Sequence, residues 1–371
     1  MKEVLTRLGK SASNCFPVKI KRILIGGLTS LTLSLLCIWA VLRFTRSGSL
    51  FANLLAVGAS TLVLSLVLVA GSWVADALRL KILASAMGGQ VRFMESLKIT
   101  VVGSFMAGVT PFDTGGEPLK IYFLHKRGLS IGTSTAVVAL GAFSHATSRF
   151  ALWLLAPVIM LLTGRSLVIP AAIKATLALG IVIYLFFMFL IIAVIFWPDW
   201  VEVFAGKLLE LKWVKKLVPQ SMAETVLDKV RTSAYDFRDG INKVKSSGSH
   251  AVFAVLLSIA YWLLVIAVPA LIVRSMVPQV SFSQVFFVAM TVYLVMAYVP
   301  TPGSSGGAEV GSAYFFASIL PAKMVGVFVV VWRFATYYFT LLVGGIIALF
   351  ETVNWWIRKS QSQSRQAEGT P

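Results

Sequence analysis

Residues 298–311 read YVPTPGSSGGAEVG and separate two apolar runs, FSQVFFVAMTVYLVMA before them and SAYFFASIL after them. Proline has no backbone N–H and ends an incoming helix, whereas glycine permits positive φ angles and close approach of backbones. At membrane depth, irregular backbone is tolerated only where protein buries it or where it lines a water-filled cavity. The stretch therefore predicts a helix that is broken inside a membrane.

The composition indicates a membrane protein. Of the 371 residues, 58% are hydrophobic and only 13% are charged, and several apolar runs approach the roughly 20 residues that cross a bilayer. Cys15 and Cys37 lie at different expected depths and lack metal-ligand neighbours, so neither a disulfide nor a metal site is expected. We place full spans at 23–42, 50–78, 149–163, 174–197, 251–272 and 324–350.

The net charge of +18 follows the expected topology. With the N-terminus inside, 25 of the 33 Lys and Arg residues lie on the inner side and 6 on the outer side, leaving Arg149 and Arg333 within spans. This asymmetry is the positive-inside rule. It explains the basic balance without nucleic acid, for which the sequence carries no binding motif. Both termini are expected on the cytoplasmic side of the cytoplasmic membrane.

Two further apolar regions, 96–124 and 282–320, fit this topology only if each enters and leaves the membrane on one face. The order span, span, broken hairpin, span then occurs twice, in opposite orientations, which is typical of an inverted-topology repeat. The predicted fold is an all-α polytopic membrane protein with about six full spans, two re-entrant broken-helix hairpins and an inverted-topology repeat.

The two breaks resemble each other. Residues 110–118 read TPFDTGGEP and residues 299–309 read VPTPGSSGGAE, so each has proline, paired glycines and a glutamate. Asp113 or Thr114 can cap the helix that begins near Glu117-Pro118, and Asp113 is favoured for that role. Facing helix starts would offer free N–H groups and positive dipole ends to an anionic head group. The residues expected to shape this backbone are Pro111, Gly115, Gly116, Pro300, Pro302, Gly303, Gly306 and Gly307.

These motifs resemble those of a known family. Pro111, Gly116-Glu117 and Lys120 resemble the first signature of the lysylphosphatidylglycerol synthase/flippase-like membrane proteins, and residues 300–309 resemble the second. The resemblance covers nearly the whole membrane portion and implies movement or accommodation of lipids across the bilayer; fused members flip an aminoacylated phospholipid. The chain departs from the pattern at Lys120, where arginine is usual, and at 144–149, a loose version of a helix that often carries an acidic–basic cluster.

Ionisable residues inside a membrane are functional candidates by default. We expect Glu117, Lys120, Glu309 and Arg333 to surround an anionic lipid head group. Alternative roles stay open for all four residues. Glu117 and Lys120, three positions apart on a helix, neutralise each other in the simplest alternative. Glu309 is alternatively a helix cap, and Arg333 alternatively forms a structural ion pair with Glu309.

Other polar residues of the spans have simpler interpretations. Arg149 is a candidate for the same lipid site, although a side chain that reaches from a span end to the interface is slightly favoured. His145 is expected to be a packing residue, and Tyr337-Tyr338 interfacial or packing residues. Asp76 and Arg79 are expected to form a pair at an interfacial helix end.

The loops argue against an enzyme. A lysyl-lipid synthase needs a soluble domain, and neither loop 198–250 nor tail 358–371 is long enough for one. The loop is amphipathic and basic and is expected to lie on an anionic leaflet. Motifs for ATP binding, zinc hydrolysis or serine hydrolysis are absent from the sequence. The expected segments are 1–22 basic and cytoplasmic, 23–197 the first repeat with the start of the second, 198–250 the loop, 251–357 the remaining second repeat and 358–371 the tail.

The predicted function is translocation of an anionic phospholipid or a polyprenyl-phosphate-linked lipid across the cytoplasmic membrane, without a cofactor. The alternative is a non-transporting membrane partner of a glycosyltransferase or lipid-modifying enzyme. The expected partners are an anionic membrane lipid and the bilayer, with such an enzyme or a second copy of the chain as further candidates.

Overall fold

The computed structural model describes residues 20–45, 57–164, 181–182, 184–186, 188–190, 192–193, 220–296 and 299–368. Within them, every regular element is a helix. Five of these helical segments are long and apolar enough to cross a membrane: Ile25–Phe44, Ala59–Ala86, Ile131–Leu162, Ser249–Met276 and Ala322–Val353. The predicted all-α polytopic membrane protein is thereby confirmed. The sixth predicted span, 174–197, lies largely outside the described residues.

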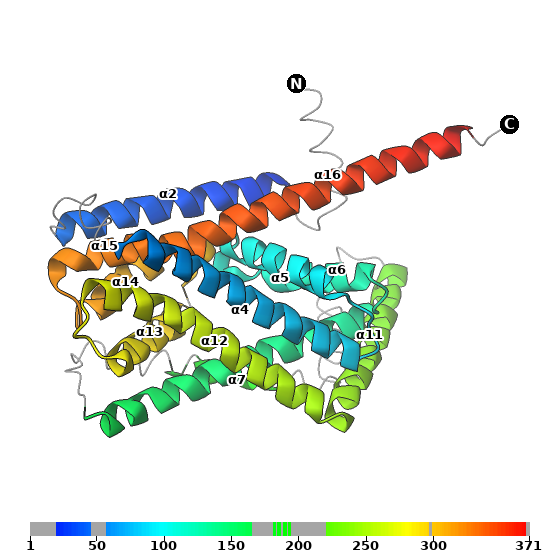
Figure 1. Ribbon diagram of the computed structural model, residues 1–371. Helices are drawn as coiled ribbons and strands as arrows, with labels where there is room; N and C mark the ends of the chain where they lie inside the picture. The colour runs from blue at the N-terminus through cyan, green and yellow to red at the C-terminus, as the bar shows by residue number, and fades with distance from the viewer. Residues whose placement is uncertain are drawn as a thin grey trace.

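Both predicted hairpins are present, and each consists of two short helices around a tight turn (Figure 1). They enter the bundle from opposite ends, and their turns, η1 and η2, contact each other. The first half of the fold comprises α2 (Ile20–Phe44), α4 (Ala59–Ala86), α5 (Phe93–Gly108), η1 (Pro111–Asp113), α6 (Gly116–Lys126) and α7 (Ile131–Leu162). The second comprises α11 (Gln220–Ser246), α12 (Ser249–Met276), α13 (Phe282–Met296), η2 (Pro302–Ser304), α14 (Gly307–Phe316) and a continuous helix of α15 (Ala322–Arg333), η3 (Phe334–Tyr338) and α16 (Phe339–Glu368).

The two halves form the predicted inverted repeat. Corresponding positions recur at one interval of 191 residues, from 111 to 302, from 116 to 307 and from 131 to 322. Helices α4 and α12 have 28 residues each and pack side by side in opposite directions (Figure 1). Helix α5 packs on α16 as α13 packs on α7. The pairing places the two hairpin tips at the centre of the bundle.

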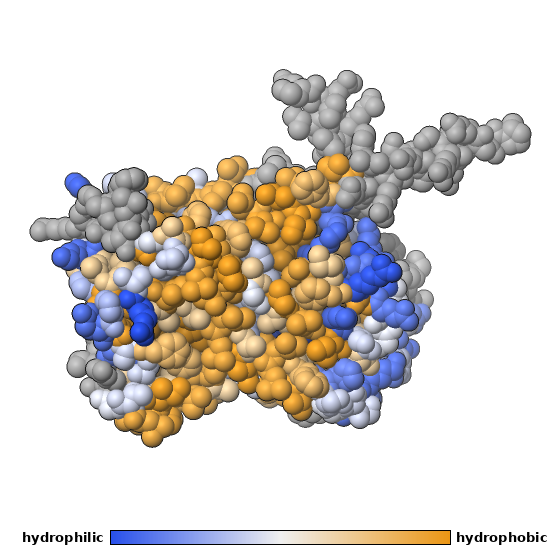
Figure 2. All heavy atoms as spheres, in the orientation of Figure 1, coloured by the Kyte–Doolittle hydropathy of each residue, from blue (hydrophilic) through white to orange (hydrophobic). Residues whose placement is uncertain are grey.

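The outer surface matches a hydrocarbon environment. Figure 2 shows apolar side chains across the middle of the bundle and hydrophilic side chains gathered toward its two ends. An apolar exterior is favourable in lipid, where helices associate through close packing and hydrogen bonds rather than by excluding water. Exposed apolar residues on this surface include Leu28, Leu64, Leu155, Leu256 and Leu342.

The core surrounds the second hairpin. Helix α13 is apolar on all sides and is buried along most of its length, as expected for a helix enclosed by other helices. Phe316 and Phe328 pack with ring centroids 4.1 Å apart, and Phe328 stacks in turn on Trp332. These contacts join α14 to α15 and give the second hairpin a rigid support.

Two predicted span boundaries are wrong. Helix α7 begins at Ile131 rather than at 149, where Ser130 caps it by accepting a hydrogen bond from Thr133 N at 3.1 Å. The prediction missed this start because the first turns contain small polar residues, which lower the hydropathy. Helix α4 continues to Ala86 rather than ending at 78. Its charged residues, Asp76 and Arg79, are buried against each other and therefore do not end the span.

Part of the predicted surface loop 198–250 packs on the protein. Residues 220–246 form α11, which lies across one end of the bundle and contacts α7 and α4 (Figure 1). Its residues Phe237, Ile241 and Val244 are buried in a cluster with side chains of those helices. Between Phe237 and Val244 the predicted position on an anionic leaflet is wrong, since these apolar side chains are covered by protein. Residues 198–219 lie outside the described part of the chain.

Candidate functional site

The two hairpin tips share one backbone conformation. In each, an extended threonine precedes proline and a short 3-10 turn. The next two residues have left-handed φ angles, 54° and 55° at Phe112 and Asp113 and 59° and 52° at Gly303 and Ser304. Such angles are uncommon outside glycine and persist where the surrounding structure imposes them, often at functional sites. The left-handed backbone of both tips therefore marks them as the candidate functional part of the repeat.

Gly303 occupies a position that no side chain can fill. A Cβ atom there would lie 2.3 Å from Cε2 of Tyr337 and 2.8 Å from the carbonyl oxygen of Gly108. Its counterpart in the first hairpin, Phe112, is 57% exposed. The second tip is thus pressed against α5 and η3, whereas the first has room for an aromatic ring.

The other predicted hairpin residues also shape the tips. The N-cap position of α6 is occupied by Gly115 rather than by Asp113, and it makes no side-chain capping hydrogen bond. The Gly115 N–H itself donates to Oγ1 of Thr110 at 2.8 Å. A Cβ on Gly116 would lie 2.9 Å from the carbonyl oxygen of Gly103, and one on Gly307 2.5 Å from Val299. Pro111 and Pro302 begin the turns, Pro300 precedes the second turn, and Gly306 caps α14.

A cavity of about 270 Å³ lies between the tips. This volume is close to the roughly 300 Å³ at the lower end of small-molecule sites. Asp113 lines it from the first hairpin, Gly303 and Ser304 line it from the second, and Arg333 provides a cation. The remaining wall carries aromatic and hydroxyl side chains, among them Trp73, Tyr261, Tyr293, Trp332, Tyr337, Ser72, Ser104 and Thr336. A cavity inside an apolar bundle that offers a carboxylate, a guanidinium group and several hydroxyls is suited to a hydroxylated or charged head group.

Arg333 and Glu309 form a buried ion pair beside this cavity. Arg333 is 2% exposed and Glu309 is 0% exposed, and Nε lies 2.8 Å from Oε1. The other carboxylate oxygen accepts the Gly306 N–H at 2.6 Å, and Ser34 Oγ donates to Oε1. Both alternatives for Glu309, helix cap and ion-pair partner, are therefore confirmed. Helix starts were expected to offer free N–H groups to a ligand, but the Gly306 N–H at the start of α14 is bonded to Glu309.

The guanidinium group of Arg333 also supports the second tip. Its Nη2 donates to Gly303 O and to Ser305 Oγ, each at 3.3 Å, and Nη1 donates to Gly303 O at 3.4 Å. The group lies 4.0 Å from the ring centroid of Tyr337. Residues 334–338 form a π-helix, a distortion frequent at functional sites. Arg333 therefore contacts the tip through long hydrogen bonds and the Glu309 carboxylate through an ion pair with atoms 2.8 Å apart.

Hydroxyl groups join α2 to the second tip. Ser30 Oγ donates to the Pro302 carbonyl oxygen at 2.7 Å and lies 2.8 Å from Ser305 Oγ. The Tyr337 hydroxyl donates to Gly108 O at 3.1 Å, and Ser34 Oγ lies 2.7 Å from the Tyr338 hydroxyl. Sequence reasoning missed Ser30 and Ser34, because lone serines inside a first span carry no distinguishing pattern.

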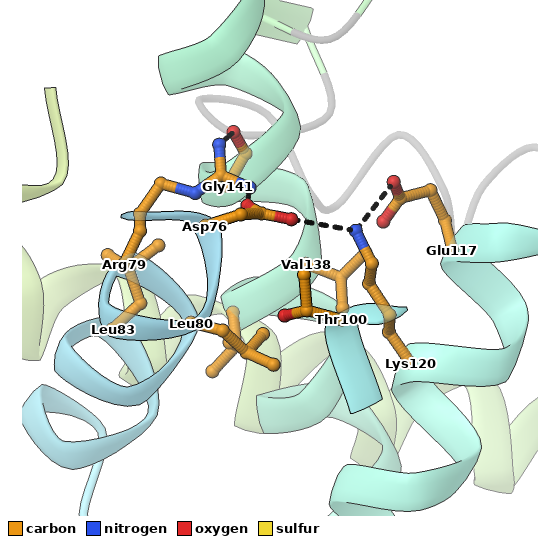
Figure 3. Close-up of a pocket in the computed structure, with 10 residues that line it drawn as sticks. Asp76, Arg79, Leu80, Leu83, Thr100, Glu117, Lys120, Val138 and Gly141 are labelled. Carbon is orange, nitrogen blue, oxygen red and sulfur yellow. Dashed lines mark hydrogen bonds and ion pairs between the residues drawn. The ribbon is translucent and has the colours of Figure 1, made fainter. Parts of the chain in front are cut away.

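Glu117 and Lys120 lie apart from this cavity, beside Asp76 and Arg79 (Figure 3). His145 contacts the same Asp76 carboxylate, and these five residues are called the α4 charge cluster. Lys120 Nζ lies 3.4 Å from Glu117 Oε1 and 3.8 Å from Asp76 Oδ2. His145 Nε2 lies 3.1 Å from Asp76 Oδ1, and Arg79 forms an ion pair with the same oxygen. Glu117 and Lys120 pair with each other, which was the alternative to a place around the head group. Asp76 contacts Arg79, Lys120 and His145 and is the centre of this cluster.

Asp76 and Arg79 are not at an interfacial helix end. Their side chains are 8% and 5% exposed, and Arg79 Nη1 donates to Gly141 O at 2.7 Å and Ser258 Oγ at 3.3 Å. The α4 charge cluster therefore connects α4, α6, α7 and α12. The available signal was an acid and a base three residues apart in an apolar run, which favours a buried pair.

Arg149 lies in the middle of α7, not at a span end as favoured from the sequence. Its guanidinium lies 5.2 Å from the ring centroid of Tyr184 and 5.3 Å from that of Trp262, so cation–π contacts take the place of the interface. Trp262 donates from Nε1 to His145 O at 3.0 Å.

Comparison with known proteins gives matches over most of the chain. The sequence model of the family described as the lysylphosphatidylglycerol synthase TM region matches residues 27–344. A protein of Archaeoglobus fulgidus named UPF0104 membrane protein is 27% identical over 332 residues, which cover 88% of this chain and 95% of that relative. Both matches are long enough to include the repeat with its two hairpins.

Proposed function

The chain belongs to the family of the lysylphosphatidylglycerol synthase TM region, and we propose that it acts as a transporter that moves an anionic phospholipid or polyprenyl-phosphate-linked lipid between the leaflets of the cytoplasmic membrane. Both termini then face the cytoplasm. The central cavity between the two hairpin tips is the observation that carries this proposal.

A lipid translocator needs a polar passage for the head group within an apolar exterior for the tails. Moving a charged or hydroxylated group through hydrocarbon costs several kcal/mol for each polar group left without a partner. The cavity offers such partners at the centre of the bundle, while apolar side chains cover the outside (Figure 2). The arrangement supports transport because head group and tails each find a matching surface.

The cavity wall has suitable groups for a phosphate ester. The Nη groups of Arg333 contact Gly303 and Ser305 at 3.3–3.4 Å, longer than is usual for a strong charged hydrogen bond. A phosphate oxygen can replace these contacts while the 2.8 Å pair with Glu309 stays in place. The aromatic rings and hydroxyls of the wall then contact the glycerol or sugar part of the lipid. Asp113 accepts a hydrogen bond from one hydroxyl of that glycerol or sugar.

Purified protein in vesicles tests the proposal. Phosphatidylglycerol with a fluorophore on one acyl chain is added to the bilayer, and a membrane-impermeant reductant reports the fraction that reaches the outer leaflet. We expect the wild type to expose inner-leaflet lipid and Arg333→Gln to do so at least about tenfold more slowly, since tenfold corresponds to about 1.4 kcal/mol and charged hydrogen bonds contribute about 1.5–3 kcal/mol.

Lys323→Gln is the matched control, because Lys323 is an exposed cation at the start of the same helix. It should transport as the wild type does. Circular dichroism and size-exclusion profiles confirm that the Arg333 variant is folded. A wild type no faster than protein-free vesicles, or a folded Arg333→Gln that keeps the full rate, would contradict the proposal.

A further inference from the structure

The α4 charge cluster is not used by the proposed head-group site. In it, Asp76 and Glu117 balance Arg79 and Lys120, and His145 lies against Asp76 at 3.1 Å. Burying so many ionisable groups is unfavourable unless they are paired. Histidine is the side chain of this set whose ordinary pKa lies near neutral pH. The cluster therefore contains one group that can change its charge while the others remain paired.

The cluster is continuous with the wall of the central cavity. Glu117, with 49% of its side chain exposed, contacts Lys120, which is 11% exposed and contacts Asp76. Beyond Asp76, the His145 ring packs edge-on against Tyr261 with centroids 4.5 Å apart, and Tyr261 lines the cavity. Side-chain contacts thus connect an exposed carboxylate, through Asp76 and His145, to a tyrosine of the cavity wall.

A small internal space adjoins these groups. It has a volume of about 10 Å³ and is lined by Asp76, Glu117, Lys120 and Thr100, with Arg79 beside them (Figure 3). Thr100 is 1% exposed, and its hydroxyl has no hydrogen-bond partner within the described part of the chain. A space of roughly 10–15 Å³ with polar partners accommodates one water molecule. That molecule would link the exposed and buried halves of the cluster.

We propose that the α4 charge cluster binds one proton together with the anionic head group, so that lipid transport is coupled to protons. This inference rests on the proposed function. A hydronium ion in the water near Glu117 releases the proton, which adds to Nδ1 of His145, a buried nitrogen without a hydrogen-bond partner among the described residues. One O–H bond of the hydronium ion breaks, one N–H bond forms, and water and an imidazolium held by Asp76 remain.

The surrounding charges determine the sign of the coupling. Burial of the ring and the cations Arg79 and Lys120 oppose the imidazolium, whereas the Asp76 carboxylate in contact with Nε2 favours it. With Glu117 included, the neutral-histidine cluster has two cations and two anions, and one added proton gives it a net charge of +1. An anion in the adjoining cavity stabilises that charge, and the charge in turn stabilises the anion, because such coupling is reciprocal.

Lipid binding measured against pH tests the coupling. The probe is dihexanoyl phosphatidylglycerol, whose phosphodiester does not titrate near neutral pH, and its Kd for the purified protein is obtained by calorimetry. We expect wild-type affinity to weaken by up to about tenfold for each unit of pH increase, the slope for one proton taken up per lipid. Calorimetry in two buffers of different ionisation enthalpy measures the number of protons taken up per lipid bound, which should also be one.

His145→Gln should remove the slope, since glutamine can still donate to Asp76 but cannot take up the proton. His250→Gln at the start of α12 is the matched control and should keep it. Binding by the wild type without any slope, or a slope that survives in His145→Gln, overturns the coupling and leaves the proposed transport standing. Failure of the probe to bind overturns both.

Discussion

The two hairpins have the same turn but are held in place in different ways. At the tip of the second hairpin, Glu309 and Arg333 are enclosed by protein, with 0% and 2% exposure. In the first hairpin, Lys120 is paired with Glu117, which is 49% exposed. One tip is therefore tied into the core, whereas the other keeps a charged group accessible.

The difference arises from the position of one carboxylate. Glu309 is the third residue of its helix, counting from Gly307, and from there it reaches back to the Gly306 N–H, as in a capping box. Glu117 is the second residue of α6, directly after Gly116, and its partner is Lys120, one turn onward. An inverted repeat can thus keep a backbone conformation while its two copies acquire different electrostatic roles.

The largest expected effect is the loss of the buried carboxylate. Glu309→Gln leaves Arg333 without its counter-charge in a buried site and should lower the free energy of unfolding by about 3–5 kcal/mol. The measurement is unfolding in mixed micelles with increasing denaturing detergent. Glu309→Leu combined with Arg333→Met removes both charges and should recover much of the loss. A single-variant loss below about 1 kcal/mol would contradict an enclosed second tip.

Equivalent tip positions should respond in opposite ways. Gly303→Ala places a methyl group within 2.3 Å of Tyr337 in a left-handed conformation and should cost about 2–5 kcal/mol, from overpacking and backbone strain together. Phe112→Gly relieves the same backbone strain at an exposed position and should be neutral or slightly stabilising. The two melting temperatures test this directly. Equal destabilisation by both changes would mean that the tips are packed alike.

An intermediate effect is expected at Lys120. Lys120→Met removes a cation from Asp76 but leaves Arg79 and His145 in contact with that carboxylate. We therefore expect a loss of about 1–3 kcal/mol in the free energy of unfolding. Lys81→Met is the control, since Lys81 is exposed on α4 and its change should stay within about 0.5 kcal/mol. Similar losses in the two variants would argue against Lys120 as a buried partner.

The smallest effect is expected at Glu117. Half-exposed ion pairs contribute about 0–1 kcal/mol, so Glu117→Gln should unfold nearly as the wild type does. The same denaturing-detergent titration compares it with Glu309→Gln, which makes an identical chemical change at the other tip. A loss from Glu117→Gln as large as that from Glu309→Gln would remove the distinction between the hairpins.

The sequence by itself determined the membrane class, the two broken hairpins and their inverted order. These features depend on local properties: apolar length against bilayer thickness, the missing N–H of proline and the conformational freedom of glycine. Spans at 23–42, 251–272 and 324–350 were placed close to the observed helices. The boundary errors at α4 and α7 arose where polar residues are satisfied inside the protein, since hydropathy counts their polarity but not their partners.

Only the tertiary structure decided which charges meet. From the sequence, Glu309 and Arg333 were candidates either for contact with a lipid or for contact with each other. Asp76 was expected at a helix end at the membrane surface. Packing of α14 against α15, and of α4 and α6 against α7, brought them to their partners. The partner of a buried charge depends on which helix packs against it. That packing is a long-range property that no local sequence pattern encodes.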